Sequence, residues 1–299
     1  MVKQKILVTG GNGFIGSHVV DNLKKKGHDV VIFDRYQDNK RGERKDVQYF
    51  YGDVTDSSAV HEAVYHSDGV IHLAGVLGTQ ETVQNPFPAV ETNVFGSLNV
   101  FTACASNNKK GVYIAVGNHW MNNPYSITKT TAERFALMFN KERGTKIAVV
   151  RGLNAFGPRQ KSAPVRKITP NFILPALKGE PILVYGDGEQ KMDMIYVEDV
   201  AEILVRALTE NHGVYDRVFE AGTGIAPTVN EIAESVIRLT NSSSRLEHTA
   251  MRPGETAGST VVADIETLKP LKFDKFTSLE EGLTKTIPWY RAWLEKNQA

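Results

Sequence analysis

Short apolar runs alternate with amphipathic segments along the first half of the chain. Six runs read as strands: KILVTG (5–10), DVVIFD (29–34), VQYFYGD (47–53), GVIHLAG (69–75), VYIAVG (112–117) and KIAVVRG (146–152). They are rich in Val and Ile and apolar throughout, which is typical of strands buried on both faces of a sheet. Segments with helical periodicity lie between them, at 17–26, 89–107 and 125–143. This alternation predicts an α/β fold with a doubly wound parallel sheet.

The rhythm changes after residue 157, where a basic, proline-bearing stretch (157–170) shows no period. Shorter elements follow near 170–178, near 182–185 and from Glu198 onward. No repeat or flexible linker separates the halves, so we interpret the second half as a cap on the first. The expected Rossmann domain comprises 1–157 with returning segments near 193–222. The smaller, mostly C-terminal cap comprises 158–192 and 223–299.

Composition narrows the class of protein. Of the 299 residues, 41% are hydrophobic and 23% are charged, which is typical of a globular protein. The 35 Lys+Arg and 34 Asp+Glu residues give a net charge of +1, and this balance argues against a general nucleic-acid binder. No apolar run approaches the roughly 20 residues that span a bilayer, and Met1 leads almost at once into the first strand, so we expect no signal segment. The single cysteine, Cys104, excludes an intramolecular disulfide and a multi-cysteine metal site. We therefore predict a cytoplasmic protein without a metal, a nucleic-acid partner or a membrane contact.

The strongest local signal is TGGNGFIG (9–16), which follows the first strand and opens the first helix. Three glycines are spaced for a tight turn, for close approach to a pyrophosphate and for helix–strand packing: Gly10, Gly13 and Gly16. The helix N-terminus supplies free N–H groups and a partial positive charge to phosphates. The turn therefore predicts a dinucleotide site, which also includes Asn12, Phe14 and Ile15. The alternative is a glycine turn that serves packing alone.

Acidic residues at the ends of the next two strands refine this site. Asp34 would accept hydrogen bonds from both hydroxyls of an adenosine ribose and repel a 2′-phosphate, so NAD is favoured over NADP; the neighbouring Arg35 weakens that preference. Asp53 could accept from the adenine amino group, with Val54 against the ring; alternatively, Asp53 caps the following helix. Small or apolar residues close the fourth strand beneath the expected cofactor: Leu73, Ala74 and Gly75.

A tyrosine and a lysine lie four residues apart in PYSITKTTAERFALMF, so Tyr125 and Lys129 share one helix face. A phenol with a pKa near 10 is a poor base at neutral pH. A lysine ammonium nearby, together with the nicotinamide charge, would favour the phenolate and could bring the pKa near 7, a shift of roughly three units.

With these motifs in this order, the chain resembles the extended short-chain dehydrogenase/reductase family, specifically its NAD-dependent nucleotide-sugar epimerase/dehydratase group. The resemblance covers essentially the whole chain. It rests on TGGNGFIG, GDVTD, HLAG, ETNVFGSLNV, YSITK, LNAFGPRQ, VYGDGEQ, IYVEDVAE and RPGE followed by Ala263 and Asp264.

The resemblance implies that the first half holds NAD and that a nucleotide-diphosphate sugar lies between the halves. Asn93 would steady the fourth helix near the active site, Asn154 and Arg252 would hold the pyrophosphate, and Tyr185 would lie near the base. Four cations form a basic loop where the substrate phosphates should lie: Arg159, Lys161, Arg166 and Lys167. The alternative for this loop is a solvated surface.

The sequence departs from the family pattern at three places. Gly117 stands where family members carry a Ser or Thr that hydrogen-bonds the reacting sugar oxygen, and no hydroxyl residue of either type occurs between Gly111 and Tyr125. The segment from that strand to Tyr125 is very short, HWMNNP. Met192 replaces an arginine that often contacts the nucleotide.

Asn118 and His119 follow Gly117 and are the candidates to replace the missing hydroxyl as hydrogen-bond donor. In similar dehydratases an acidic pair occupies roughly these positions. Asn118 cannot act as an acid or base, whereas His119 can, with an ordinary pKa near 6.5. The alternative for His119 is a loop histidine that faces solvent.

These observations favour an NAD-dependent nucleotide-sugar epimerase, most simply a 4-epimerase with a transient 4-keto intermediate. A dehydratase is the second interpretation, although the missing acidic pair argues against the usual 4,6-dehydratase. A reductase or dehydrogenase of a small alcohol, and a catalytically weakened nucleotide-sugar-binding protein, remain as alternatives.

We also predict a homodimer. The helices at 89–107 and 125–142 are expected to carry an outward apolar face, and related enzymes pair these helices into a four-helix bundle. The face would consist of Phe95, Leu98, Phe101, Phe135 and Phe139.

Overall fold

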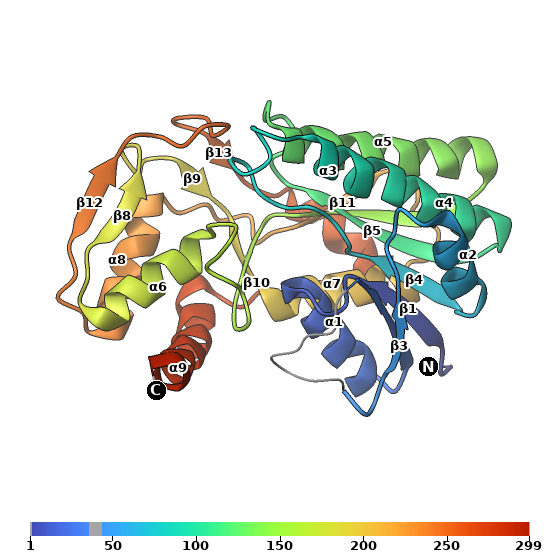
Figure 1. Cartoon of the computed structure of the whole chain (residues 1–299), viewed down its shortest axis with the longest axis horizontal. Helices are drawn as coiled ribbons and strands as arrows, with labels where there is room; N and C mark the ends of the chain where they lie inside the picture. Colours follow the sequence, from blue (N-terminus) through green and yellow to red (C-terminus); the bar gives the residue numbers. More distant parts are fainter. Residues whose placement is uncertain (1, 36–43, 299) are drawn as a thin grey trace.

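A seven-stranded parallel sheet forms the centre of the larger part of the molecule. The computed structural model describes residues 2–35 and 44–298, and the strand order is β11-β6-β5-β4-β1-β2-β3 (Figure 1). The strands are β1 (Lys5–Thr9), β2 (Asp29–Asp34), β3 (Gln48–Tyr51), β4 (Gly69–His72), β5 (Lys110–Val116), β6 (Lys146–Gly152) and β11 (Val218–Ala221). The predicted α/β fold with a doubly wound parallel sheet is confirmed.

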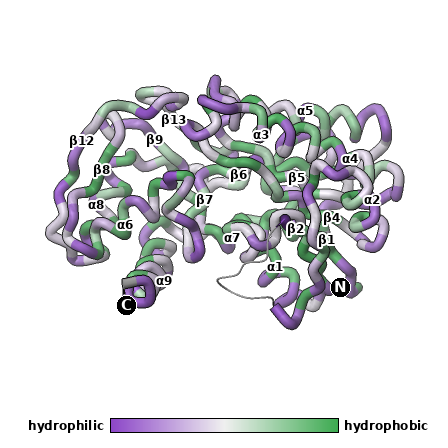
Figure 2. Tube along the Cα trace, viewed as in Figure 1, coloured by the Kyte–Doolittle hydropathy of each residue, from purple (hydrophilic) through white to green (hydrophobic). Residues whose placement is uncertain are grey.

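Alternating side chains of the strands face two helical layers. In β1, Ile6 and Val8 belong to the core that includes α1 and α7, whereas Leu7 belongs to the core that includes α2 and α4. Both faces are therefore covered, which explains why the strands are apolar throughout; Figure 2 shows β5 and β6 in green. The helices of this part are α1 (Phe14–Lys25), α2 (Ser57–Tyr65), α3 (Phe87–Val90), α4 (Ser97–Ser106), α5 (Pro124–Arg143) and α7 (Val197–Thr209).

The helix expected at 89–107 is continuous from residue 87 to 106 but is not α-helical throughout. A π-helical segment, η1 (Glu91–Gly96), lies between α3 and α4.

The outward apolar face predicted on the helices at 89–107 and 125–142 is wrong in part. Phe101 and Phe139 are 1% and 3% exposed and pack against β5 and β6, whereas Phe95 is 57% exposed. Both helices are apolar on more than one side, so periodicity alone did not separate the inner face from the outer one.

A smaller group of elements forms the cap, on the left of Figure 1, where the C-terminus also lies. Its elements are α6 (Ile168–Lys178), β8 (Ile182–Tyr185), β9 (Lys191–Met192), α8 (Val229–Thr240), β12 (Leu246–Thr249), β13 (Thr260–Val261) and α9 (Leu279–Gln298). Two short strands, β7 (Asn154–Phe156) and β10 (Met194–Tyr196), pair with each other where the chain passes between the two parts. Thr228 and Glu231 form a capping box that begins α8.

The 3-10 helix η2 (Ile265–Leu271) packs on the sheet instead of the cap. Leu268 and Leu271 belong to the same core as β1 and α7, and the hydroxyl oxygen of Thr267 accepts from the backbone N–H of Glu220 in β11 (2.9 Å). We therefore propose that the cap predicted as 158–192 and 223–299 excludes this segment. Among residues 2–35 and 44–298, no helix is both long and apolar enough to cross a membrane.

Candidate active site

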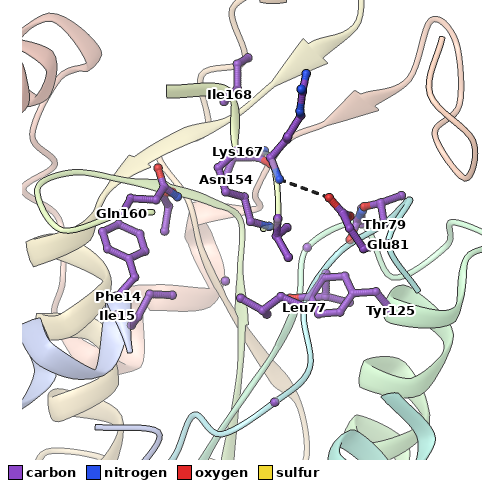
Figure 3. Close-up of a pocket in the computed structure, with 18 of the residues that line it drawn as sticks. Phe14, Ile15, Leu77, Thr79, Glu81, Tyr125, Asn154, Gln160, Lys167 and Ile168 are labelled. Atoms are coloured by element: carbon purple, nitrogen blue, oxygen red, sulfur yellow. Dashed lines mark hydrogen bonds between the residues drawn. The ribbon is translucent and has the colours of Figure 1, made fainter. Parts of the chain in front are cut away.

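A cavity of about 730 Å³ lies at the carboxyl ends of the strands and extends into the cap (Figure 3). In open parallel sheets this edge is where ligands bind. The lining runs from Gly10 after β1, through Asp34 at the end of β2 and Tyr125 on α5, to Arg252 in the cap. Figure 3 labels lining residues from both parts, among them Phe14, Ile15, Tyr125, Asn154 and Lys167.

The glycine turn is too tightly packed for side chains. Gly10 has a φ of +70°, and a Cβ there would lie 2.9 Å from the backbone nitrogen of Ala74. A Cβ on Gly16 would lie 2.1 Å from the carbonyl oxygen of Gly10. Gly13 caps α1 without any side-chain hydrogen bond, so the N–H groups that begin at Phe14 remain available to an anion. This cradle fits a dinucleotide pyrophosphate.

The carboxylate of Asp34 is held at the end of β2. Its Oδ2 accepts from the backbone N–H of Asn12 (3.1 Å), and its Oδ1 accepts from the backbone N–H of Arg35 (2.8 Å). Asp34 lines the cavity, so it is placed to accept hydrogen bonds from the hydroxyl groups of a ribose.

Asp53 also lines the cavity, together with Val54. Its Oδ1 accepts from the N–H and the hydroxyl of Thr55 (both 2.9 Å), and its Oδ2 pairs with Arg35 (3.4 Å). Burial opposes ionisation of Asp53, but these hydrogen bonds and the charge of Arg35 outweigh it and lower its pKa. The N-cap of α2 is Asp56, so Asp53 does not have the capping role considered as its alternative.

The segment after β4 forms the floor of the cavity. Thr9 Oγ1 accepts from the backbone N–H groups of Leu73 (3.2 Å) and Ala74 (3.1 Å). A Cβ on Gly75 would lie 3.0 Å from Oδ1 of Asn93, so a side chain there would press on that amide.

Asn93 ties this floor to α5. Its Oδ1 accepts from Val76 N (2.8 Å), and its Nδ2 donates to Val76 O and to Thr128 Oγ1 (both 3.0 Å). Asn93 is fully buried within η1, and π-helical turns often occur at functional sites.

Tyr125 and Lys129 occupy the first turns of α5, which begins at Pro124 after the N-cap Asn123. Both side chains line the cavity. Burial raises the pKa of Tyr125 to about 12 and lowers the pKa of Lys129 to about 7. The expected Tyr125 pKa near 7 is therefore not seen in the chain alone, because removal from water disfavours the phenolate.

The two donor candidates after β5 lie differently. Asn118 lines the cavity; its Oδ1 accepts from Ser126 Oγ (3.3 Å), and its Nδ2 lies 3.1 Å from the Met121 sulfur. His119 is not among the lining residues, and its Nδ1 lies 3.2 Å from the carbonyl oxygen of Gly117.

Position 117 has no room for a larger residue as the chain is packed. A Cβ on Gly117 would lie 2.8 Å from Cγ of Leu153 and 3.2 Å from its Cα. The hydroxyl that the family pattern places here would therefore require Leu153 to move.

On the cap side, two arginines contact Tyr185 and a lysine lies near Tyr125. The guanidinium of Arg252 lies 5.0 Å from the centroid of the Tyr185 ring and pairs with Glu255. Arg166 Nη1 donates to the Tyr185 hydroxyl (2.9 Å). Lys167 Nζ lies 6.0 Å from the centroid of the Tyr125 ring, and burial lowers its pKa.

The predicted basic loop does not act as a unit. Arg166 and Lys167 line the cavity, but Arg159 pairs with Asp21 of α1 (2.7 Å) and Lys161 is exposed. The expectation that Arg159 and Lys161 face the substrate phosphates is therefore wrong, because one is held by the first helix and the other lies in solvent.

Asn154 lines the cavity, and its Nδ2 donates to the carbonyl oxygen of Asp193 (3.1 Å). The Asp193 carboxylate is fully buried and accepts from the backbone N–H groups of Thr223, Gly224 and Ala263. This aspartate, which follows the replaced arginine position, therefore joins three segments of the fold.

Sequence reasoning missed Glu81. It follows β4, lines the cavity beside Lys167 (Figure 3), and accepts from the backbone N–H of Arg166 at Oε1 (3.2 Å). Its place shortly after the carboxyl end of a central strand was the available signal. Across residues 2–35 and 44–298, no three His, Cys, Asp or Glu side chains cluster as a metal site would require.

Comparisons with known proteins agree on one family. A family model described as NAD dependent epimerase/dehydratase family matches residues 6–222. A UDP-N-acetyl-alpha-D-glucosaminuronate decarboxylase from Bacillus cytotoxicus is 30% identical and aligns over 97% of this chain and 98% of its own length.

Two solved structures are similar over almost the whole chain. The UDP-glucose 4-epimerase of Thermotoga maritima with UDP-glucose has a TM-score of 0.90 and 28% identity, covering 97% of this chain and 99% of that one. The UDP-glucose 4-epimerase of Thermus thermophilus in complex with NAD has a TM-score of 0.86 and 26% identity, covering 96% of this chain and 99% of that one.

Proposed function

We propose that this chain, which belongs to the NAD-dependent epimerase/dehydratase family, is a nucleotide-sugar 4-epimerase. The observation that carries the proposal is the continuity of one cavity. It joins the glycine turn, the Tyr125–Lys129 pair and the cap residues around Tyr185. A cofactor on one side and a charged nucleotide on the other would bring a sugar between them, next to Tyr125.

The residues at the first end of the cavity fit NAD. We propose that the turn from Gly10 to Gly16 binds its pyrophosphate, Asp34 its adenosine ribose and Asp53 with Val54 its adenine. The floor after β4 supports the rest of the dinucleotide. When bound, NAD supplies a reversible hydride acceptor and a positive charge on its nicotinamide ring.

Tyr125 would remove the proton from the sugar 4-hydroxyl. It would return the proton after the 4-keto sugar has rotated to present its other face. A phenol with a pKa of about 12 needs positive charge to do this at neutral pH. We propose that the Lys129 ammonium, one turn along α5, and the bound nicotinamide supply it. We propose that the Asn118 amide donates to the reacting sugar oxygen, because Asn118 lines the cavity and His119 does not.

At the other end, we propose that Arg252, Asn154 and Lys167 bind the pyrophosphate of the substrate and that Tyr185 lies near its base. Arg252 supports this assignment, because its Nε is buried without a hydrogen-bond partner in the described part of the chain. Glu255 occupies Nη2, so the unsatisfied Nε–H is a donor that a phosphate oxygen of the substrate can use.

A decarboxylase is the second candidate, because the Bacillus cytotoxicus relative has that activity in its name and is 30% identical. Such a reaction could begin with the same oxidation at C4.

The homodimer and the cytoplasmic location also remain proposals. The exposed Phe95 on η1 supports the homodimer.

The test is incubation of the purified protein with UDP-, GDP- and dTDP-sugars, followed by NMR of the products. An isomeric sugar without net NADH supports the 4-epimerase. Loss of carbon dioxide supports the decarboxylase, loss of water a dehydratase, and net NADH a dehydrogenase. Binding without turnover of any sugar contradicts an enzyme of this kind.

A further inference from the structure

One buried tyrosine contacts Lys129 at two points. Tyr113 lies on β5 and is fully buried. Its hydroxyl donates to the backbone carbonyl oxygen of Lys129 (3.0 Å), and the Lys129 ammonium lies over its ring, 4.3 Å from the centroid. The tyrosine therefore contacts both the helix turn that carries Lys129 and the charged end of the side chain.

Among residues 2–35 and 44–298, the Lys129 ammonium has no carboxylate partner that could take this role. In the part of the chain that the structure describes, no acidic oxygen lies within 4 Å of Lys129 Nζ. The acid one turn along α5, Glu133, binds Arg151 with both oxygens (2.9 and 2.6 Å). The ring face of Tyr113, 4.3 Å from Nζ, can offset part of the cost of burying this charge, because an aromatic face attracts a desolvated cation.

We propose that Tyr113 is a positioning residue for the catalytic pair, whose ring keeps Lys129 protonated and whose hydroxyl fixes its turn of α5. This inference rests on the proposed role of Tyr125 and Lys129. Burial lowers the pKa of Lys129 to about 7, so a modest change at the ring alters the fraction of ammonium at neutral pH.

Other titratable groups lie around Lys129 on two elements. Tyr125 and Glu133 lie on its own helix, and His72 on β4 contacts the Tyr113 ring (centroids 5.8 Å apart). Burial, with a smaller contribution from the Lys129 charge, lowers the pKa of His72 to about 3, so this ring stays neutral. The hydrogen bonds of His72 also fit a neutral ring. Thr9 Oγ1 already accepts two backbone N–H groups, so its hydroxyl hydrogen is directed to His72 Nδ1 (2.7 Å), which must therefore accept.

The test replaces Tyr113 by phenylalanine and then by phenylalanines with increasing fluorination. Fluorination weakens the negative face of the ring while the side chain keeps its shape. The pKa of Lys129 is read directly from the NMR shift of its ¹⁵Nζ as pH is varied, so turnover is not needed. Phe101 is the matched control, because its ring packs edge-on against Tyr113 (5.4 Å) and is not the ring beneath Lys129.

We expect Tyr113→Phe to leave the Lys129 pKa nearly unchanged while kcat falls several-fold at constant KM. Full fluorination at position 113 should lower the pKa by about one unit, and fluorination at 101 should not. The alkaline limb of kcat/KM should move to lower pH by the same amount. A Lys129 pKa that does not respond to fluorination at 113 overturns the inference. If the wild type turns over no nucleotide sugar, the proposed function fails, but the Lys129 titration still decides the role of Tyr113.

Discussion

At the end of β2, the carboxylate of Asp34 is held by two backbone N–H groups and faces the cavity. We predict that Asp34→Ala weakens NAD binding by roughly 1.5–3 kcal/mol, the scale of a lost charged hydrogen bond. The same change should reduce the difference between the affinities for NAD and NADP. Isothermal titration with both nucleotides measures this. Asp29→Ala, at the opposite end of β2, is the control; its exposed carboxylate pairs with Lys3, so NAD affinity should not change. Tighter binding of NADP by the wild type would show that Asp34 has been assigned wrongly.

The donor to the reacting oxygen is a second prediction at this scale. Asn118→Ala should lower kcat by roughly 10²–10³ with NAD binding unchanged, the effect of removing a preorganised donor. His119→Ala should remain within a few-fold of wild type, because His119 does not line the cavity. Steady-state kinetics of the two alanine variants shows which side chain is the donor. A large loss of kcat in His119→Ala alone would reverse the two roles.

Individual residues show what sequence could and could not predict. The places of Gly10, Asp34, Tyr125 and Lys129 follow from local motifs, because strand ends and helix spacing are local properties. The pKa of Tyr125 does not, because it depends on burial by segments far away in the chain. Glu81 was missed for the same reason: only the folded chain brings its loop beside Lys167.

At the scale of elements, the ends of β5 and β6 are packed closely enough to constrain position 117. The family pattern suggests that Gly117→Ser would restore a useful hydroxyl. The structure predicts instead that it destabilises the fold by about 1–3 kcal/mol, because the new Cβ would meet Leu153 at 2.8 Å. Thermal melting tests this, and Leu153→Ala in the same chain should recover part of the loss. A serine variant as stable and as active as wild type would contradict the packing.

Six strands of the central sheet and β8 were predicted to within a few residues, since apolar runs bounded by polar turns mark buried strands directly, but β11 (Val218–Ala221) was not predicted as a strand. The π-helical η1 was not predicted either. Its Asn93 bonds Val76 and Thr128, which lie 17 and 35 residues away in sequence. A local periodicity could not reveal these contacts, so the sequence predicted a regular helix at 89–107, whereas the structure has a π-helical segment within a continuous helical run.

At the scale of the whole molecule, η1 and α5 carry exposed apolar side chains. Phe95 is 57% exposed and Ile127 is 52% exposed. We predict that this face joins two copies of the chain and that Phe95→Glu shifts a dimer toward monomer in light scattering at micromolar concentration. Ile225→Glu, at an exposed apolar residue after β11, is the control. A monomeric wild type would contradict the homodimer.

The central claim is that a hydride leaves C4 of a nucleotide sugar and returns to the same carbon. Its most direct test is incubation with a UDP-hexose that carries deuterium at C4, with the product analysed by NMR and mass spectrometry. We expect the C4 epimer with deuterium retained at C4 and no accumulation of reduced NAD. Deuterium recovered at C6 with loss of water, or deuterium left on reduced NAD without formation of the epimer, would contradict the 4-epimerase.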